Sequence, residues 1–335
     1  MRIGIDAMGG DNAPAVEVKG ALAAKKFLGA GDKIVLIGHE EAMRKELAGA
    51  DGWQDFIELK HASQRISMDD SPVEALRGKP DSSLMVMAQL ARAGSVDACI
   101  SAGNTGAFVA AAQMRLRRVP GVHRPGIAVV TPTFHGPVAV CDVGANVSCR
   151  PQHLHQYAIM ASIYLNSICG IKNPRVGLLS IGEEDAKGTG LVKETRELLK
   201  GDESIQFIGN VEGRDLFSGA CDVMICDGFT GNVVLKLLEG MAQGITKGIV
   251  REIVALMPEH VDAIKKAAYA FATKYDFNEY GGAPLLGVGG ICIICHGASD
   301  YRGIMNAVRV AVDFSKRQVN QQITQSLSSH RPEEA

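Results

Sequence analysis

Glycines and short polar side chains follow the apolar, β-branched runs of this sequence. The first run ends at GGDN, and later runs end at SAGNTG, DVGAN, IGEEDAKGTG, DGFTGN and HGAS. Glycine lets a bound group approach backbone N–H groups, and the N-terminus of a helix favours negative charge. The set of loops therefore predicts a site for a phosphate-like anion, with room for a larger co-substrate. Any one loop, taken alone, is better explained as a turn with a helix cap.

The candidate phosphate- and substrate-binding residues all lie in these loops. They are Gly9, Gly10, Asp11, Ser101, Gly103, Asn104, Thr105, Gly106, Asn146, Gly188, Thr189, Asp227, Gly228, Thr230 and Gly231. Asp6 and Asp11 carry the wrong charge for holding an anion themselves. We expect these two carboxylates to brace the loops by hydrogen bonds.

Segments with helical spacing separate most of the apolar runs, for example SSLMVMAQLARAG and LVKETRELLK. Strands that are apolar on both faces and alternate with helices are typical of a parallel sheet covered on both sides. The carboxyl ends of parallel strands face one way, and ligands bind at that edge. The sequence therefore predicts that all the polar loops share one edge of the sheet.

The domain organisation is expected to be simple. We predict a single α/β catalytic domain over residues 1–325, with a helical hairpin inserted at about 240–277 and broken near Pro258. Residues 326–335 are polar and are expected to form a frayed tail.

Composition narrows the class of protein. At 335 residues and 46% apolar content, the chain is long enough for a large α/β domain. A net charge of −2 provides no global field, so no nucleic-acid partner is expected. The N-terminus lacks the pattern of a signal peptide, and no apolar run approaches the roughly 20 residues of a membrane span. These features predict a cytoplasmic location.

Several familiar chemistries lack their motifs. Cys292, Cys295 and His296 spell C-x-x-C-H, the haem-attachment pattern, but they lie in a run typical of a buried strand. The cysteines and histidines lack zinc-site spacing, so no metal is expected. No G-x-G-x-x-G follows a strand, and neither a P-loop nor G-x-S-x-G is present.

Taken together, the loop motifs closely resemble those of the bacterial phosphate acyltransferase family, PlsX. The motifs GIDAMGGDNAP, SAGNTGA, DVGAN, IGEEDAKGTG, GNVEGRD, DGFTGNVVLKLLEG and GGAPLLGVGG, followed by HGAS, occur in order from residue 3 to about residue 300. GIDAMGGD and DGFTGN are the most specific of them. The resemblance covers nearly the whole chain.

The resemblance implies an activity and a fold. The enzyme would transfer a long-chain acyl group from acyl carrier protein to inorganic phosphate, giving acyl phosphate for a membrane-bound glycerol-3-phosphate acyltransferase. It would be a homodimer without an organic cofactor. The fold would be a three-layer α/β/α sandwich with a mostly parallel, Rossmann-like sheet, related to phosphotransacetylases and isocitrate-dehydrogenase-like enzymes.

Three residues are candidates for the chemistry. Phosphate is already a competent nucleophile and a thiolate leaves easily, so the enzyme must supply orientation, charge screening and oxyanion donors. Lys187 could neutralise phosphate, and Asn232, like Asn104 and Asn146, could donate to the oxyanion. His296 could protonate the departing sulfur or, equally, cap its loop.

An acidic carrier protein needs a basic docking surface. RLRRVPGVHR supplies Arg115, Arg117, Arg118 and Arg124 after a predicted helix. A solvated helix C-terminus explains one arginine, and the cluster favours docking.

The helical hairpin carries the membrane prediction. Leu256 and Met257 lie at its tip, and Ile264, Ala268 and Phe271 recur at helical spacing beyond it. Such a pattern is typical of a helix at an interface, and members of the family are thought to associate peripherally with membranes. The same stripe is equally expected to pack against a second copy of the chain.

Three other functions remain open from the sequence. A phosphotransacetylase-like enzyme would use acyl-CoA, and a non-catalytic scaffold of lipid synthesis would keep the hairpin but would not need the polar loops. A dehydrogenase of related fold would need a nucleotide-binding motif, which is not visible.

Overall fold

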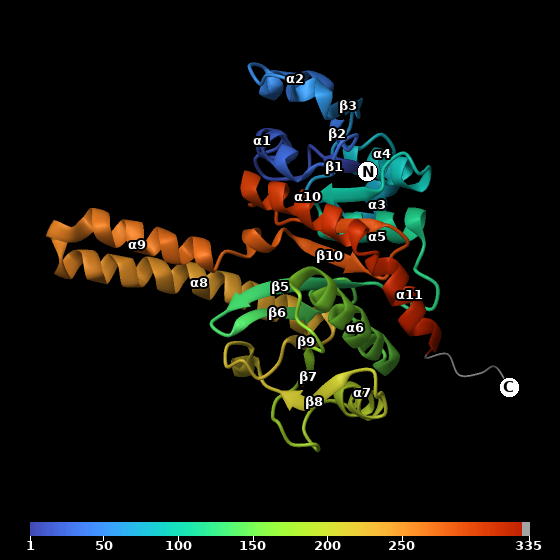
Figure 1. Cartoon of the computed structure of the whole chain (residues 1–335), viewed down its shortest axis with the longest axis vertical. Coiled ribbons are helices and arrows are strands. Elements are labelled where there is room, and N and C mark those ends of the chain that lie inside the picture. Colours follow the sequence, from blue (N-terminus) through green and yellow to red (C-terminus); the bar gives the residue numbers. More distant parts are fainter. Residues whose placement is uncertain (330–335) are drawn as a thin grey trace.

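A computed structural model describes residues 1–329, apart from the side chains of Gln243 and Phe277 (Figure 1). The described residues build one 11-stranded sheet in the order β3-β2-β1-β4-β11-β10-β5-β6-β9-β7-β8. The strands are β1 (Arg2–Asp6), β2 (Lys33–Gly38), β3 (Ile57–His61), β4 (Ala98–Ser101), β5 (Gly126–Thr133), β6 (Gly136–Cys141), β7 (Arg175–Leu179), β8 (Gln206–Val211), β9 (Val223–Ile225), β10 (Ala283–Leu286) and β11 (Ile291–Ile294).

The sheet consists of two parallel blocks that run in opposite directions. Strands β3, β2, β1, β4 and β11 pair in parallel, and so do β6, β9, β7 and β8. Between the blocks, β11–β10, β10–β5 and β5–β6 are antiparallel pairs. Because three antiparallel pairs follow one another, the strands of the second block run in the opposite direction to those of the first. The prediction of a mostly parallel sheet is confirmed, but the prediction that all polar loops share one edge is wrong.

Helices cover both faces of the sheet, which gives the predicted three layers. Helices α1, α2, α6, α7, α10 and α11 contribute to one core, and α3, α4, α5 and the start of α8 contribute to the other. The helices are α1 (Ala15–Ala23), α2 (Glu40–Leu47), α3 (Pro72–Gly78), α4 (Ser83–Arg92), α5 (Thr105–Leu116), α6 (Pro151–Tyr164), α7 (Gly190–Lys200), α8 (Gly228–Leu256), α9 (Val261–Lys274), α10 (Tyr301–Lys316) and α11 (Val319–Ser329).

The strand that sequence reasoning missed is β10, which joins the two blocks. Only four residues long, it follows Gly281 and Gly282, whose φ angles of 83° and 82° let the chain turn sharply into the sheet. Its sequence, APLL, is too short to show an alternating pattern.

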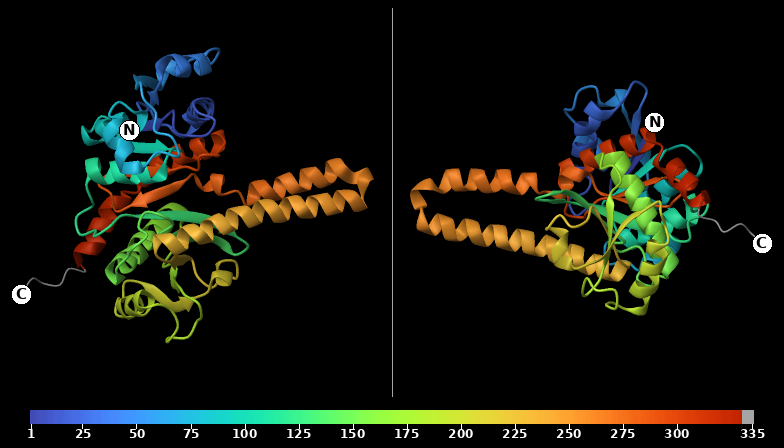
Figure 2. Two further views of the ribbon diagram at one scale, coloured as in Figure 1. Left: turned by 180° about the vertical axis from the view of Figure 1, so that it is seen from behind. Right: turned by 60° about the horizontal axis from the view of Figure 1, so that its bottom comes forward.

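The helical pair α8–α9 projects far beyond the sheet (Figures 1 and 2). The break at Pro258 lies where it was expected, in a short 3₁₀ turn between the two helices. Helix α8 begins at Gly228, well before the expected boundary near 240, so one uninterrupted helix of 29 residues connects the sheet to the tip.

The C-terminal segment corrects another expectation. Residues 326–329 belong to α11, and Leu327 is buried against the core, so this part is not a frayed tail. Residues 330–335 lie outside the described part of the chain. Within residues 1–329, none of the helices combines the length and the apolar character needed to cross a bilayer.

Candidate active site

A cavity of about 350 Å³ opens on the sheet face that α5 and α8 cover, and we name it the central cavity. Its floor is apolar and comes mainly from β5, β10 and β11. Its polar walls come from the start of α5, the loop after β6, helix α8 and the loop after β11. The polar lining side chains are Thr105, Asn232, Lys236, Glu239, Asn278, His296 and Ser299.

The paired glycines after β1 allow close packing of neighbouring segments. A Cβ atom at Gly9 would lie 2.7 Å from the backbone nitrogen of Gly103 in the loop after β4. At Gly10, a Cβ would collide with the Glu17 carboxylate of α1. Asp11 donates its backbone N–H to the carbonyl of Gly297 over 2.9 Å. The loops after β1, β4 and β11 are thus locked together, and the glycine pair has a structural cause.

Two polar side chains of the SAGN loop also hold the scaffold. Ser101 donates its hydroxyl to the buried Asp6 carboxylate over 2.8 Å and accepts the N–H of Gly103. Burial raises the pKa of Asp6, and hydrogen bonds from Ser83, Ser101 and the N–H of Met8 oppose the rise. Asn104 caps α5 through the N–H of Ala107 and donates its amide group to carbonyls of the 67–70 segment. Asp6 therefore braces the loops as predicted.

The locked loops after β1, β4 and β11 form one corner of the central cavity, and Glu17 is a buried carboxylate beneath them. Its Oε1 accepts the N–H of Gly10 over 3.1 Å, and its Oε2 has no hydrogen-bond partner among the described residues. The pKa of Glu17 is raised to about 7, mainly by burial with a contribution from the nearby Asp6, while the Gly10 hydrogen bond and Arg65 oppose the rise. Arg65 also donates to the Gly10 carbonyl, over 3.1 Å.

The opposite corner is organised by Asp142, at the end of β6. This carboxylate is fully buried and accepts five hydrogen bonds of 2.8–3.2 Å. Burial raises the pKa of Asp142, and the hydrogen bonds pull it down. The donors are the N–H groups of Ile127, Gly144, Ala145 and Asn146, and the Asn146 amide.

The DGFTGN loop packs tightly onto this corner. Asp227 caps α8 through the N–H groups of Phe229 and Thr230 and also accepts the Thr230 hydroxyl. A Cβ at Gly231 would collide with the carbonyl of Asp142, and Gly228 donates to the Asn146 carbonyl over 2.9 Å.

The amide group of the Asn146 side chain forms its hydrogen bonds inside the protein. Its amide group bonds to the Pro125 carbonyl, the Tyr157 hydroxyl and the Asp142 carboxylate. Asn146 is 5% exposed. Like Asn104, it holds the framework rather than facing the cavity.

Three ionisable side chains converge on one wall of the central cavity. Lys236 Nζ lies 2.9 Å from Glu239 Oε2 and 3.0 Å from His296 Nε2. The N–H of Ala298 donates to His296 Nδ1 over 3.2 Å. A neutral ring that accepts at Nδ1 carries its proton on Nε2, so the lysine ammonium and the imidazole N–H are then two donors 3.0 Å apart. Both face Glu239 Oε2, which lies 2.9 Å from Lys236 Nζ and 3.7 Å from His296 Nε2. A shared acceptor such as an anionic oxygen suits this arrangement.

The structure brings only some of the predicted residues to this cavity. Thr105, Gly106, Asn232 and His296 line it. Lys187 is exposed in the loop after β7, at the same sheet edge as the loops after β6 and β9, but it does not line the cavity. In that same loop, Gly188 has a φ of 97° and Thr189 caps α7.

The predicted docking arginines differ in exposure. Arg117, Arg118 and Arg124 are exposed, whereas Arg115 is half-buried. Arg118 donates to the backbone carbonyl of His123. Arg124 Nη1 lies 3.5 Å from the side-chain amide oxygen, Oδ1, of Asn146. The hairpin tip is open to solvent, with Leu256 81% and Met257 42% exposed.

Lys236 and Glu239 were missed by sequence reasoning. They follow Asn232 at helical spacing, so the three side chains lie along one side of α8, and that spacing was the available signal. Within the described residues, no group of three or more His, Cys, Asp or Glu side chains could hold a metal ion. Cys292 and Cys295 are buried free thiols in and beside β11, as the buried-strand interpretation predicts.

Comparisons with known proteins agree with this architecture. A family model described as "Fatty acid synthesis protein" matches residues 1–322. The phosphate acyltransferase of Geotalea uraniireducens (strain Rf4) is 45% identical over 334 residues, 99% of this chain and 96% of the relative. That of Geobacter sulfurreducens is 45% identical over 98% of this chain and 95% of the relative. A solved phosphotransacetylase from Streptococcus pyogenes has the same fold, with a TM-score of 0.62 at 15% identity over 94% of each chain. The similarity to the named enzymes extends over nearly the whole chain, and the chain therefore belongs to the phosphate acyltransferase family.

Proposed function

We propose that this enzyme transfers a long-chain acyl group from acyl carrier protein to inorganic phosphate, and that the reaction takes place in the central cavity. The observation that carries the proposal is the convergence of Lys236 and His296, 3.0 Å apart, on a wall of that cavity. An ammonium and an imidazole N–H together suit a phosphate oxygen. The apolar floor beside them suits an acyl chain.

In the proposed reaction, a phosphate oxygen attacks the thioester carbon. The new C–O bond forms, the carbonyl electron pair moves to oxygen, and its return expels the thiolate as the C–S bond breaks. Hydrogen phosphate carries the proton that finally resides on the thiol. His296 Nε2 passes this proton on by donating its own to sulfur and taking the phosphate proton in return.

The polar lining residues have distinct proposed roles. Lys236 fixes the phosphate, and Glu239 holds the lysine in place through its 2.9 Å ion pair. Asn232, one turn nearer the start of α8, donates to the oxyanion of the tetrahedral intermediate. Lys187, on the sheet edge outside the cavity, attracts phosphate during its approach.

Steady-state kinetics with an acyl carrier protein thioester test these roles. Lys236→Ala is expected to raise KM for phosphate and to lower kcat, with a loss of kcat/KM of about a hundredfold, because a charge-assisted contact disappears. Lys187→Ala is expected to raise KM several-fold, mainly at low salt. Lys247→Ala, an exposed lysine farther along α8, is the matched control and should match the parent enzyme. Full activity of Lys236→Ala would refute the site.

We propose that the exposed arginines after α5 receive the carrier protein. Arg117→Glu with Arg118→Glu should weaken use of the carrier thioester by about tenfold, with a shallower salt dependence than the parent. A short thioester without the carrier should react as before. Equal loss with both donors would assign these arginines to the fold, and preference for acyl-CoA would favour a phosphotransacetylase-like donor instead.

We propose that α8 forms a homodimer interface and that the hairpin tip touches the membrane. Helix α8 carries an exposed apolar stripe at intervals of four residues, and each side chain in it is 50–63% exposed. The stripe consists of Phe229, Val233, Leu237, Met241, Ile245 and Ile249. Of the α9 residues expected to form such a stripe, Ile264 and Ala268 are half-buried.

Two double variants separate the stripe from the tip. Leu237→Glu with Ile245→Glu should give a monomer in sedimentation equilibrium, because charges would enter the interface.

Leu256→Glu with Met257→Glu should stay dimeric and active in solution but lose sedimentation with anionic vesicles. A dimeric stripe variant, or unchanged vesicle binding by the tip variant, would remove the corresponding proposal. Membrane contact would bring the product to the membrane-bound glycerol-3-phosphate acyltransferase that consumes it.

A further inference from the structure

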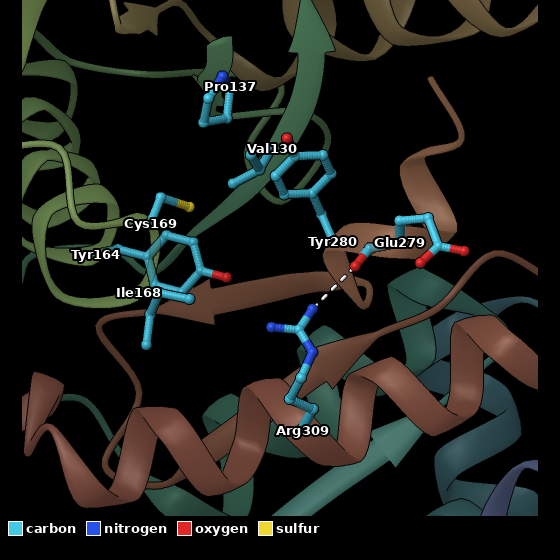
Figure 3. A pocket seen from close by; sticks show the side chains of 8 residues that line it. All are labelled: Val130, Pro137, Tyr164, Ile168, Cys169, Glu279, Tyr280 and Arg309. Atoms are coloured by element: carbon cyan, nitrogen blue, oxygen red, sulfur yellow. Dashed lines mark hydrogen bonds between the residues drawn. The ribbon is translucent and has the colours of Figure 1, made fainter. Parts of the chain in front are cut away.

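A second cavity, also of about 350 Å³, lies on the other side of the sheet, between α6, α10 and the segment before β10 (Figure 3). We name it the Tyr164 pocket. Its walls combine apolar and aromatic side chains with one guanidinium group. The lining residues are Val130, Pro137, Tyr164, Ile168, Cys169, Glu279, Tyr280 and Arg309.

Tyr164 contributes a hydroxyl group to this pocket. The residue is 1% exposed, and its hydroxyl faces the hollow between Tyr280 and Arg309 (Figure 3). Among the described residues, no hydrogen bond to this hydroxyl is formed, although its ring packs against Phe314 with centroids 6.2 Å apart. A buried phenol usually finds a hydrogen-bond partner. A ligand acceptor in the pocket would provide it.

Arg309 supplies positive charge at the edge of the same hollow. Its Nη2 donates to the Glu279 carbonyl over 2.9 Å, which uses one of five N–H donors. Its Nη1 forms an ion pair with Asp313 at 3.9 Å, a distance too long for a hydrogen bond. The Glu279 carboxylate pairs with Arg302 at 3.3 Å. The guanidinium therefore retains donors for an anion.

The remaining walls suit a short apolar body. Val130 and Pro137 come from the β5–β6 hairpin, and Ile168 and Cys169 from the π-helical turn Leu165–Cys169 that follows α6. The Tyr280 ring closes the side next to Val130 (Figure 3). A volume of about 350 Å³ is at the small end of the range for ligand sites. The pocket holds the first part of a chain rather than a whole long-chain acyl group.

We propose that the Tyr164 pocket binds an alkyl carboxylate or alkyl phosphate, with the anionic head on Arg309 and Tyr164 and the first methylenes against Ile168, Pro137 and Tyr280. Free fatty acid and acyl phosphate share this chemistry. The pocket adjoins the central cavity, because Val130 lines both, and Asn278 lines the central cavity while the next two residues line the Tyr164 pocket. Binding here does not depend on which acyl donor the enzyme uses.

Calorimetric titration of the full-length protein tests the proposal, with octanoate and octyl phosphate as probes and octanol and inorganic phosphate as comparisons. Octanoate or octyl phosphate should bind at least tenfold more tightly than octanol, and the stronger of the two identifies the preferred head. Replacing octanoate by heptanoate should raise Kd about fourfold, as expected for one buried methylene. Failure of both anionic probes to bind at millimolar concentration would overturn the proposal.

Variants locate the bound probe. Arg309→Gln should raise Kd for octanoate tenfold or more, because a hydrogen bond to a charged group is lost. Tyr164→Phe removes a single oxygen atom and should raise it about threefold to tenfold. Lys236→Ala, in the central cavity, should leave Kd unchanged. Binding that depends on Lys236 but not on Arg309 would assign the probe to the central cavity and refute the second site.

Protection of Cys169 provides a readout that does not depend on affinity. Burial raises the pKa of this thiol to about 11, so its alkylation is slow and is best followed in alkaline buffer. Saturating octanoate should slow alkylation of Cys169 several-fold in peptide mass spectra, while the half-buried Cys149 serves as the internal control. Equal rates with and without octanoate would contradict occupation of the pocket.

Discussion

Two buried carboxylates hold the two corners of the central cavity, and they do so differently. Asp142, under the loops after β6 and β9, accepts five hydrogen bonds through its two oxygens. Glu17, under the loops after β1 and β11, accepts the N–H of Gly10, and its second oxygen has no hydrogen-bond partner in the described chain. Both groups are almost completely buried.

The difference shows that a buried carboxylate can have a fully bonded charge in one place and a titratable charge in another. Five hydrogen bonds replace the water that the Asp142 carboxylate loses on burial, so the positions of the loops that donate them are fixed. Glu17 lacks that compensation, and its pKa rises to about 7. The corner at β1 therefore changes its charge near neutral pH, whereas the Asp142 corner is organised around its hydrogen-bond network.

Asp142→Ala should have the largest effect on stability. The substitution leaves four backbone N–H groups without their acceptor, two of them buried, and we expect a loss of about 3 kcal/mol in the free energy of unfolding. Urea denaturation measures it. Asp142→Asn, which keeps one acceptor oxygen, is the matched control and should lose less. Equal stability of Asp142→Ala and the parent would break the contrast between the two corners.

Glu17→Gln should have a pH-dependent effect. The folded protein binds a proton at Glu17 more tightly than the unfolded chain, because the pKa is raised from 4.5 to about 7. This contribution to the free energy of unfolding is fully present below about pH 4.5 and is lost as the pH rises through about 7. The difference amounts to about 3 kcal/mol. Glu17→Gln should therefore gain on the parent between about pH 5 and pH 8 in urea denaturation. A constant difference over that range would show that Glu17 does not titrate there.

Ser101→Ala should have the smallest effect. The hydroxyl gives Asp6 one hydrogen bond and accepts another from Gly103, so its loss should cost about 1 kcal/mol. It should also raise the pKa of Asp6 further, because one bond that favours the charged form disappears. Urea denaturation at neutral pH measures the loss of stability. A loss equal to that of Asp142→Ala would mean that the two corners are equally rigid.

The strands other than β10 and the helical pair were predictable from the sequence because each depends on local pattern. Ile3 and Ile5 of β1 are fully buried, as an apolar run predicts, and Pro258 lies at the break between the helices. The reversal of the second block depends on β10, whose antiparallel pairs link segments far apart in sequence. Such pairing leaves no periodic signal in four residues.

The candidate site was predictable in part. His296 and Asn232 line the cavity, but Asn104 and Asn146 do not offer their amide groups to it, because neighbouring carbonyls already accept from them. Sequence alone identifies a residue able to donate but not where its hydrogen bonds go. Lys236 escaped notice because a lone lysine in a helix has no distinctive motif, and only its place opposite His296 marks it.

Helix α8 connects the wall of the central cavity to the tip of the projecting helical pair. Its 29 residues correspond to about 43 Å, with the Lys236 side chain near one end and Leu256 at the other. A rigid rod cannot tilt at the tip without moving at the base. If the tip binds a membrane as proposed, anchoring it is expected to shift Lys236 and so the proposed phosphate site. A comparison of KM for phosphate with and without vesicles would detect this coupling.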